Sequence, residues 1–456
     1  MKEFDVIIIG AGPAGIITGV TAKGQYPDKS MLMFKEEEKG LVPCGIPYVF
    51  YRLDDVEKNV MGPKPFIDLG GEVVKGTVNN VDLNTKTVTT KTGNEYRFKK
   101  LVFATGSIAV IPSFIEGNNL ENVFYIKKSY EYIKEILEKL RSKKNIVVIG
   151  GGFIGAEVTE QLSMHPEKQV TIIESEANCF SKAFSKELSQ IATDALKQTR
   201  ANVLTSRQVD KIIGTDGIAT SVILNNGEEI KCDAVIMAIG YKPNTDLAKN
   251  AGLEINEAGA IIVDHYERTK IKDICAVGDC SQTIGFLTGR IDNIMLASTA
   301  TAEARVLGHN LFGIKIRKSF TGTLAVFSTE INGIAMASAG VNDSNAEEGN
   351  IQYISSKFSD FDMHPGTFEN TSPLTLKLYA SPHDGSIIGG EVWGGKSSGE
   401  IINTISLAIQ KGVTVYELIS FQIGSHPLLT PAPTKTILIK AAEKIINEIE
   451  KKTVNK

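Results

Sequence analysis

The sequence lacks several features that would place the protein in a specialised class. It has only five cysteines in 456 residues, too few for the disulfide framework of a small secreted protein. Its formal net charge of -4 lacks the excess of positive charge that is typical of proteins that bind nucleic acid. No apolar run reaches the ~18 residues of a membrane span, and the run after Met1 stops too early for a signal peptide. These absences predict a cytoplasmic protein that binds neither nucleic acid nor membrane.

The chain repeats a pattern of short apolar strand, glycine loop and helix. Residues 4–9, apart from Asp5, and residues 146–149 are apolar runs, which predicts parallel strands covered on both faces. Residues 129–141 carry apolar side chains at helical spacing and predict an amphipathic helix. The length allows about three domains.

The sequence pattern changes after about residue 320. Alternating stretches at 374–379 and 387–393 predict two strands, and the turn-rich stretch 382–386 between them predicts a hairpin. Helices are expected near 400–410 and 435–448. This part of the chain is therefore predicted to be a separate α+β domain.

Two glycine-rich loops each follow a predicted strand and precede a predicted helix. In such a loop, one glycine permits the tight turn, one lets a pyrophosphate approach the backbone, and one lets the helix pack on the strand. A single loop of this kind is a weak signal, but two of them one domain length apart predict two dinucleotide sites. The glycines are Gly10, Gly12 and Gly15 in the first loop, and Gly150, Gly152 and Gly155 in the second.

An acidic residue is expected about 20 positions after each loop, where it binds a ribose hydroxyl. Glu174 fits the second loop and favours NADH, because a carboxylate repels the 2′-phosphate of NADPH. Glu36 is the candidate after the first loop. Two sites imply two cofactors, and a hydride from NADH usually passes to a flavin. The predicted cofactors are therefore FAD and NADH, and the strand-to-turn stretches at 101–107 and 274–280 support the flavin.

The motifs together resemble those of the pyridine nucleotide–disulfide oxidoreductases. The matching stretches are GAGPAG at 10–15, ATG at 104–106, GGGFIGAE at 150–157, AIGYKPN at 238–244 and AVGDC at 276–280. The resemblance covers essentially the whole chain. It implies an α/β fold with two Rossmann-like dinucleotide-binding domains, the FAD domain being split by the NAD domain, plus a C-terminal α+β dimerisation domain. The implied domains are residues 1–115 with 241–320 for FAD, 116–240 for NAD(H), and 321–456 for the interface of a homodimer.

The resemblance also implies roles for individual residues. Asp279 would hold the ribityl chain of the flavin, and Glu157 would lie beside the bound nicotinamide nucleotide. The implied cofactor-binding residues are Gly10, Gly12, Pro13, Ala14, Gly15, Glu36, Thr105, Gly106, Asp279, Gly150, Gly152, Ile154, Gly155, Glu157, Glu174 and Gly240.

Cys44 narrows the resemblance to the single-cysteine branch of the family. The two-cysteine members carry a CxxxxC pair near this position, whereas this chain has Cys44 alone. Cys275 and Cys280 have the spacing of a pair but flank the segment assigned to FAD. The predicted function is FAD-dependent reduction by NAD(P)H of a low-molecular-weight disulfide, persulfide or polysulfide, CoA-linked, through Cys44. The alternatives are an NADH oxidase that reduces O2 and a reductase of a small electron-transfer protein such as rubredoxin.

Two departures from the family patterns bear on this choice. NADH oxidases and peroxidases usually have a histidine in the first loop, where this chain has Gly12-Pro13-Ala14. His426-Pro427 resembles the His-Pro of the two-cysteine reductases, where the histidine is an acid/base for the partner subunit's site. Pro431 replaces the acidic residue that would orient it. His426 is therefore a candidate proton donor or a turn residue.

Tyr48 is a further candidate, or else a core residue, because it lies four positions after Cys44 and could share a helical face with it. The other histidines show no metal-ligand spacing, and no metal site is predicted.

Overall fold

The computed structural model describes residues 1–292, 294–316 and 319–454, and these form two compact units. Unit 1 comprises Met1–Ile149, His165–Lys168 and Val209–Thr323. Unit 2 comprises Gly150–Met164, Gln169–Gln208 and Leu324–Lys456. The two compact units do not coincide with the three domains expected from the sequence, and the three-domain division remains a prediction.

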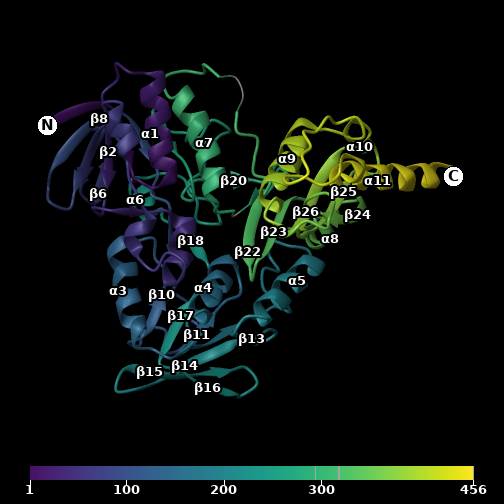
Figure 1. The fold of residues 1–456 in the computed structure, drawn as a ribbon. Coiled ribbons are helices and arrows are strands. Elements are labelled where there is room, and N and C mark those ends of the chain that lie inside the picture. Colours follow the sequence, from purple (N-terminus) through teal and green to yellow (C-terminus); the bar gives the residue numbers. More distant parts are fainter. Residues whose placement is uncertain (293, 317–318, 455–456) are drawn as a thin grey trace. The chain divides into compact units, whose positions relative to one another are not determined.

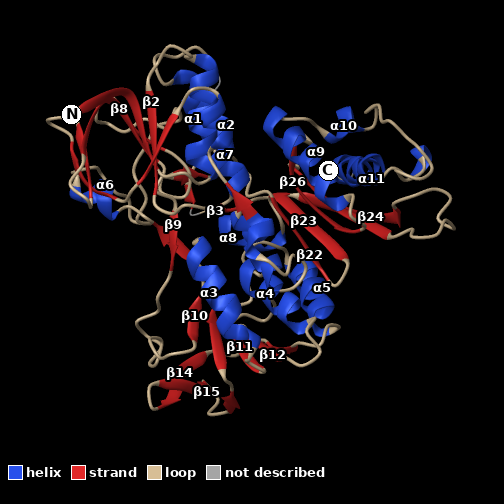
Figure 2. Ribbon diagram, turned by 60° about the vertical axis from the view of Figure 1, so that its left-hand side comes forward, coloured by secondary structure: helices blue, strands red, loops and turns tan. Residues whose placement is uncertain are grey.

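A seven-stranded sheet with the order β5-β2-β1-β8-β7-β6, and with β19 beside β8, forms the core of unit 1. β5, β2, β1, β8 and β19 are parallel, and β7 and β6 add an antiparallel edge. The predicted first strand is confirmed as β1. Its side chains are buried on both faces of the sheet, as the full burial of Val6, Ile7 and Ile8 shows. The helices α1 and α7 pack side by side (Figures 1 and 2) over the face that carries Val6 and Ile8. The bounds are β1 (Lys2–Ile9), β2 (Met31–Lys35), β5 (Glu72–Lys75), β6 (Val78–Asp82), β7 (Thr87–Thr90), β8 (Glu95–Phe103), β19 (Ile274–Ala276), α1 (Pro13–Gln25) and α7 (Ala297–Asn310).

Smaller elements complete unit 1. The predicted amphipathic helix is confirmed as α3 (Tyr130–Arg141), which Ser129 caps by accepting a hydrogen bond from the backbone N–H of Tyr132 (3.2 Å). β10, β17 and β11 are parallel neighbours in that order. The remaining bounds are β3 (Gly40–Leu41), η1 (Pro43–Phe50), η2 (Val56–Asn59), β4 (Val60–Met61), α2 (Lys64–Asp68), β9 (Ser107–Ala109), β10 (Val123–Tyr125), β11 (Asn145–Ile149), β14 (Val209–Thr215), β15 (Ile218–Leu224), β16 (Glu229–Lys231), β17 (Ala234–Met237), β18 (Tyr241–Pro243), α6 (Asp246–Asn250), β20 (Thr283–Ile284) and β21 (Ile291–Asp292).

An antiparallel sheet with the order β22-β23-β26-β25-β24 dominates unit 2. The predicted hairpin is confirmed as β25 and β26, and the two predicted helices as α9 and α11. α9 packs against β23 and β26, and α11 against β24 and β25. The bounds are α4 (Phe153–Ser163), β12 (Gln169–Ile173), α5 (Lys186–Lys197), β13 (Asn202–Leu204), β22 (Phe327–Ile331), β23 (Ile334–Gly340), α8 (Asp343–Gly349), β24 (Ile354–Phe361), β25 (Pro373–Ala380), β26 (Ile387–Gly394), α9 (Ser398–Lys411), α10 (Val415–Leu418), η3 (Pro433–Lys435) and α11 (Ile437–Val454).

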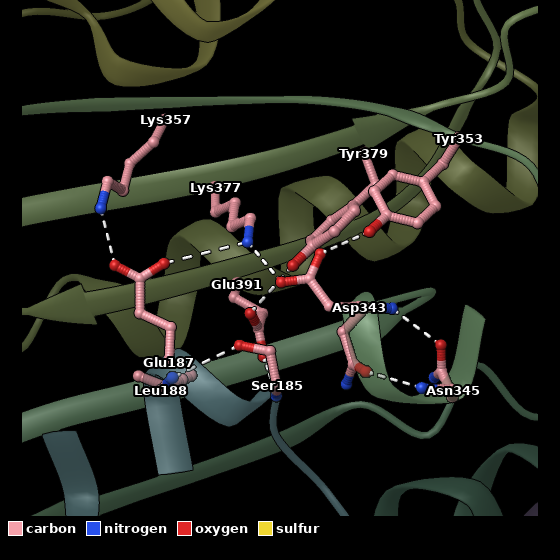
Figure 3. Close-up of polar contacts among 11 residues, drawn as sticks. Ser185, Glu187, Leu188, Asp343, Asn345, Tyr353, Lys357, Lys377, Tyr379 and Glu391 are labelled. Atoms are coloured by element: carbon pink, nitrogen blue, oxygen red, sulfur yellow. Dashed lines mark hydrogen bonds and ion pairs between the residues drawn. The ribbon is translucent and has the colours of Figure 1, made fainter. Parts of the chain in front are cut away.

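A polar cluster ties α5 to this sheet inside unit 2 (Figure 3). Glu391 on β26 is fully buried and accepts hydrogen bonds from the backbone N–H of Ser185 (2.7 Å) and the hydroxyl of Tyr379 (3.2 Å). Burial raises the pKa of Glu391, and these bonds oppose that rise. Glu187 in α5 also approaches Lys377 on β25 (3.8 Å). The cluster fixes the start of α5 against the sheet.

Among the described helices, none combines the length and the apolar character needed to cross a bilayer.

Candidate active site

The first glycine loop joins β1 to α1 in unit 1. Gly10 has a φ of +118°, and a Cβ there would lie 2.1 Å from the carbonyl oxygen of Ala104, so no other residue fits without strain. At Gly12 a Cβ would meet nothing within 4 Å. α1 begins at Pro13 with no acidic residue in its first turn and no side-chain cap. An anion can therefore reach its first backbone N–H groups, and this arrangement fits the pyrophosphate of FAD.

A second group of predicted FAD residues lies where β8 and β19 end. Asp279 follows β19, and its carboxylate accepts hydrogen bonds from Ser107 (2.7 Å) and from the ammonium of Lys128 (2.8 Å). Lys128 also donates to Ser107 (2.7 Å) and lies over the ring of Tyr241 (4.8 Å to the centroid). Nothing in the sequence marked Lys128 as part of this group, because its link to Asp279 spans 151 positions. Asp279 is thus held by two side chains, and its role at the ribityl chain of the flavin stays a prediction.

Thr105 and Gly106 connect this group to another loop of unit 1. The hydroxyl of Thr105 donates to the carbonyl of Asn244 (2.5 Å), and the carbonyl of Gly106 accepts from the backbone N–H of Asn244 (2.9 Å). Gly240 is exposed, and its carbonyl accepts from the N–H of Val110 (3.0 Å). The AIGYKPN stretch is therefore hydrogen-bonded to the segment after β8.

The acidic run after β2 separates into two roles. Glu37 accepts hydrogen bonds from the hydroxyl of Ser129 and the backbone N–H of Tyr130 (2.7 Å), so it helps to cap α3. Glu36 is exposed and accepts from the hydroxyl of Thr77 (3.1 Å). Glu36 therefore remains the candidate for a ribose hydroxyl.

Cys44 is exposed and lies at the second position of the 3₁₀ helix η1. The turn before it is braced by Asn59. The side-chain amide of Asn59 donates to the backbone carbonyl of Val42 (3.0 Å), and the backbone carbonyl of Asn59 accepts from the backbone N–H of Val42 (2.9 Å). A Cβ on Gly45 would lie 2.0 Å from Oδ1 of the buried Asn59. The glycine after Cys44 therefore lets the brace approach closely.

Gly45→Ala is expected to lower the free energy of unfolding by about 1–3 kcal/mol, because the methyl group overlaps the Asn59 amide. Thermal unfolding and the rate of thiol labelling at Cys44 would measure the effect. Gly62→Ala is the matched control, since a Cβ there meets nothing within 4 Å. An unchanged stability and labelling rate in Gly45→Ala would show that the brace does not hold the turn.

Tyr48 is partly exposed and belongs to the same helix as Cys44. The expectation that the two share a helical face assumed an α-helix. In a 3₁₀ helix three residues make one turn, so positions four apart point in different directions. A role for Tyr48 beside Cys44 therefore stays a prediction. The end of η1 is anchored by His165, whose Nε2 lies 2.9 Å from the carbonyl oxygen of Phe50.

The second glycine loop and Glu174 come together in unit 2. The N–H of Gly150 donates to the carbonyl of Ile173 at the end of β12 (2.9 Å). Glu174 follows that strand, and its carboxylate accepts from the N–H of Gly151 and from the N–H of Glu176 (2.7 Å). Gly152 directly precedes α4, with nothing within 4 Å of a Cβ placed there. Ile154 is the second residue of α4. A carboxylate beside an open helix N-terminus suits a nucleotide with a free 2′-hydroxyl.

Glu174→Gln is expected to lower the preference for NADH over NADPH by about tenfold or more, because the variant loses the charge that repels a 2′-phosphate. Initial rates with both nucleotides would give the ratio of kcat/KM. Glu176→Gln is the matched control, since Glu176 is exposed and offers only its backbone N–H to the site. Equal ratios in the wild type and Glu174→Gln would remove Glu174 from coenzyme selection.

Glu157 lies on the buried side of α4. Its Oε1 accepts a hydrogen bond from the hydroxyl of Thr329 on β22 (2.8 Å). Burial raises the pKa of Glu157 to about 7, and the Thr329 bond opposes this rise. Its neighbour Glu160 is also buried and accepts from the backbone N–H of Asn332 (2.7 Å). The position beside a bound nicotinamide nucleotide stays a prediction.

His426 lies in an exposed turn of unit 2 whose backbone orients the ring. The N–H of Leu428 donates to its Nδ1 (3.3 Å), so the neutral ring carries its hydrogen on Nε2. His364 joins the same turn: its N–H donates to the carbonyl of Pro427 (3.0 Å), and its Nδ1 lies 2.8 Å from the carbonyl oxygen of Thr430. Since a carbonyl oxygen can only accept, His364 donates from Nδ1 and, when neutral, leaves Nε2 as an acceptor. No sequence pattern marked this second histidine, which is 62 positions away from His426.

The other four cysteines are buried. Burial raises the pKa of Cys179, Cys232 and Cys275 to about 12 in each case and raises that of Cys280 as well. The thiol of Cys280 donates to the carbonyls of Val277 (3.4 Å) and Phe103 (3.5 Å). A Cys275–Cys280 pair is not formed, and Cys44 is the exposed cysteine of the chain.

Comparison with known proteins places these features in context. Residues 4–304 match the model of the pyridine nucleotide-disulphide oxidoreductase family, and residues 326–437 match the model of its dimerisation domain. The chain is 32% identical over 353 residues to the NAD(P)H sulfur oxidoreductase (CoA-dependent) of Pyrococcus abyssi, covering 75% of this chain and 76% of that protein. It is 27% identical over 426 residues to an NADH oxidase of Enterococcus faecalis, covering 91% and 93%. A solved structure of an NAD-dependent persulfide reductase from A. fulgidus superposes with a TM-score of 0.89 at 29% identity, covering 98% of this chain and 83% of that one.

Proposed function

Because this chain belongs to the pyridine nucleotide-disulphide oxidoreductase family and is therefore a flavin-dependent NAD(P)H oxidoreductase, we propose that it reduces a small sulfur compound through Cys44. The substrate class is a low-molecular-weight persulfide, polysulfide or disulfide, with CoA as the carrier thiol. The observation that carries the proposal is the braced turn that exposes Cys44, while the other four cysteines are buried. The CoA-dependent and persulfide-reducing names of two relatives support the substrate class.

The proposed reaction balances with one hydride. For a CoA persulfide it is CoA–S–SH + NADH + H⁺ → CoA–SH + H₂S + NAD⁺. FAD, when bound, accepts the hydride of NADH and returns an electron pair to sulfur. The Cys44 thiolate attacks one sulfur of the S–S bond, releases the other as a thiolate, and keeps the attacked sulfur as a mixed disulfide or persulfide. Reduction of that S–S bond restores the thiolate for the next turnover.

His426 is the proposed proton donor to the leaving thiolate. Its Nε2 carries the hydrogen in the neutral ring, as a donor requires, because Nδ1 is occupied by the N–H of Leu428. The resemblance to the His-Pro reductases implies that this histidine serves the site of a second copy, so a homodimer is part of the proposal. The match of residues 326–437 to the family's dimerisation domain supports it. Leu428 and Leu429 beside His426 are 55% and 72% exposed. Exposed apolar side chains of this kind are typical of a surface that a second copy would cover.

NADH is the proposed electron donor, because Glu174 places a carboxylate against the second glycine loop. The proposed cofactor domains remain residues 1–115 with 241–320 for FAD and 116–240 for NADH.

Anaerobic oxidation of NADH with CoA persulfide, CoA disulfide, polysulfide or no acceptor tests the proposal. Turnover is expected with at least one sulfur acceptor and not in its absence. The alternative is an NADH oxidase, the name of another relative. Turnover that appears only with air, or only with a small redox protein, would replace the sulfur reductase by an oxidase or an electron carrier.

A further inference from the structure

Two buried carboxyl groups of unit 1 lie behind the loop that carries Asp279. Glu303 in α7 is 1% exposed. Its Oε2 accepts a hydrogen bond from the backbone N–H of Gly278 (2.9 Å), and its Oε1 accepts from the hydroxyl of Thr283 (3.2 Å). Gly278 directly precedes Asp279 in the chain. Glu303 therefore holds the loop on both sides of the proposed flavin-binding carboxylate.

Glu267 is the second buried carboxyl group and is 2% exposed. Its φ is +62°, an unusual value for a residue other than glycine. Hydrogen bonds hold it there: its N–H donates to the carbonyl of Asp264 (2.9 Å), and its carbonyl accepts from the N–H of Ala276 on β19 (3.1 Å). Its Oε2 has no hydrogen-bond partner among the described residues. A buried ionised carboxylate with a bare oxygen is costly, so this group favours the protonated form.

The charges around Glu267 and Glu303 also favour the protonated form of the two carboxyl groups. Burial and the nearby charge of Glu303 raise the pKa of Glu267 well above its usual range, with a smaller contribution from Asp264. Asp264 is itself paired with Arg268 (2.6 Å). Burial raises the pKa of Glu303 to about 7, with Asp279 adding to the rise and the bonds from Gly278 and Thr283 opposing it.

No cation neutralises either carboxyl group within the described parts of the chain, since Arg268 pairs with Asp264 and Lys128 with Asp279. The neighbouring thiol of Cys275 is kept neutral by burial. The pair must therefore carry at least one proton to be tolerated in this environment.

We propose that Glu267 and Glu303 form an acid pair that holds one proton on Glu267 and positions the Gly278–Asp279 loop for FAD. Ionised Glu303 is the full acceptor for the N–H of Gly278, and protonation of Glu303 weakens that bond. FAD binding is thereby linked to the release of one proton from the pair. Glu267 and Glu303 are positioning residues that act through the loop. The proposal rests on the assignment of Asp279 to FAD and is independent of which electron acceptor the enzyme uses.

The linkage has a distinctive sign. A buried carboxyl group with a raised pKa binds more protons in the folded than in the unfolded protein, so its contribution to fold stability falls as the pH rises towards about 7. FAD retention has the opposite dependence, because ionised Glu303 holds the loop. Acidification is therefore expected to loosen the flavin while this pair favours the fold, which a purely structural role would not produce.

The first test follows FAD release from the diluted holoenzyme by flavin fluorescence, from about pH 6 to about pH 8, on either side of the Glu303 pKa of about 7. Release from the wild type is expected to be several-fold faster at the acidic end, with about tenfold per pH unit as the limit for one proton. Glu303→Gln should release FAD fast at every pH. Glu391→Gln, which changes a buried carboxyl group of unit 2, should match the wild type.

The second test is the infrared spectrum of the holoenzyme in the carbonyl region of protonated carboxylic acids. Other buried acids with a raised pKa, such as Glu157, absorb in the same region, so the spectrum of Glu267→Gln is subtracted from that of the wild type near neutral pH. The difference is expected to show the band of one protonated acid, and the variant should keep FAD because its neutral amide replaces the neutral acid. The proposal is overturned if the difference shows no such band or if FAD release does not vary with pH. The pH dependence of release from the wild type decides even if a variant does not fold. Neither test uses a sulfur acceptor, so failure here leaves the sulfur-reductase proposal standing, and the reverse also holds.

Discussion

Replacing Cys44 by serine is expected to abolish turnover with sulfur acceptors, by a factor of about 10³ or more, the order seen when a nucleophile is removed. A serine hydroxyl is not ionised near neutral pH and cannot form the sulfur–sulfur bond that carries the intermediate. The reduction of bound flavin by NADH should be unaffected, because hydride transfer does not use the cysteine. Stopped-flow absorbance of the flavin would separate this half-reaction from the sulfur half-reaction.

Cys232→Ala is the control for Cys44→Ser. It removes a buried thiol of the same unit, at the residue after β16, and should keep sulfur turnover. The account is contradicted if Cys44→Ser still reduces the sulfur acceptor at a rate near that of the wild type. If both half-reactions fail together, the variant has lost its flavin, and the test should be repeated with Cys44→Ala.

The second large effect is expected from Gly10→Ala. A methyl group there would overlap the carbonyl oxygen of Ala104, and the φ of +118° would strain any other residue. The free energy of unfolding should fall by about 3 kcal/mol or more, since backbone atoms must move. The purified protein should carry little FAD, because the distorted turn no longer presents the start of α1 to a pyrophosphate. Flavin absorbance and thermal unfolding would measure the two effects.

Two control variants in the same region separate the effect on stability from the effect on FAD binding. Gly24→Ala lies in α1 with nothing near its Cβ and should be neutral or slightly stabilising. Gly12→Ala meets nothing within 4 Å but fills the space that an approaching pyrophosphate would need. It should therefore fold normally and bind FAD weakly. A Gly10→Ala protein with normal flavin content would contradict the assignment of this loop to FAD.

The parts of the fold that the sequence predicted are those with local signals. The apolar run at 4–9, the helical spacing at 129–141 and the alternation at 374–379 each carry their pattern within a few residues, and each element formed as expected. The glycine spacings likewise encode their loops locally. Cys44 and Glu174 were found because their types and positions relative to these loops carry the chemistry.

The parts that the sequence did not predict depend on contacts between distant positions. Lys128 bonds to Asp279, and Asn59 braces Val42, through hydrogen bonds that no local sequence pattern predicts. No local pattern marks Glu303, yet α7 buries it completely. The segment that carries Cys44 and Tyr48 forms a 3₁₀ helix where an α-helix was expected, and a role for Tyr48 beside Cys44 stays a prediction.

The most direct test of the central claim is the mass of the Cys44 peptide after the enzyme, with its thiols free and its flavin oxidised, meets one equivalent of CoA persulfide without air and without NADH. The sample is then quenched by acid. The account predicts a sulfur or CoA adduct on Cys44 and on no other cysteine, lost again when NADH is added before the quench. An unmodified Cys44 in a sample that has consumed the persulfide would show that the electrons reach sulfur by another route.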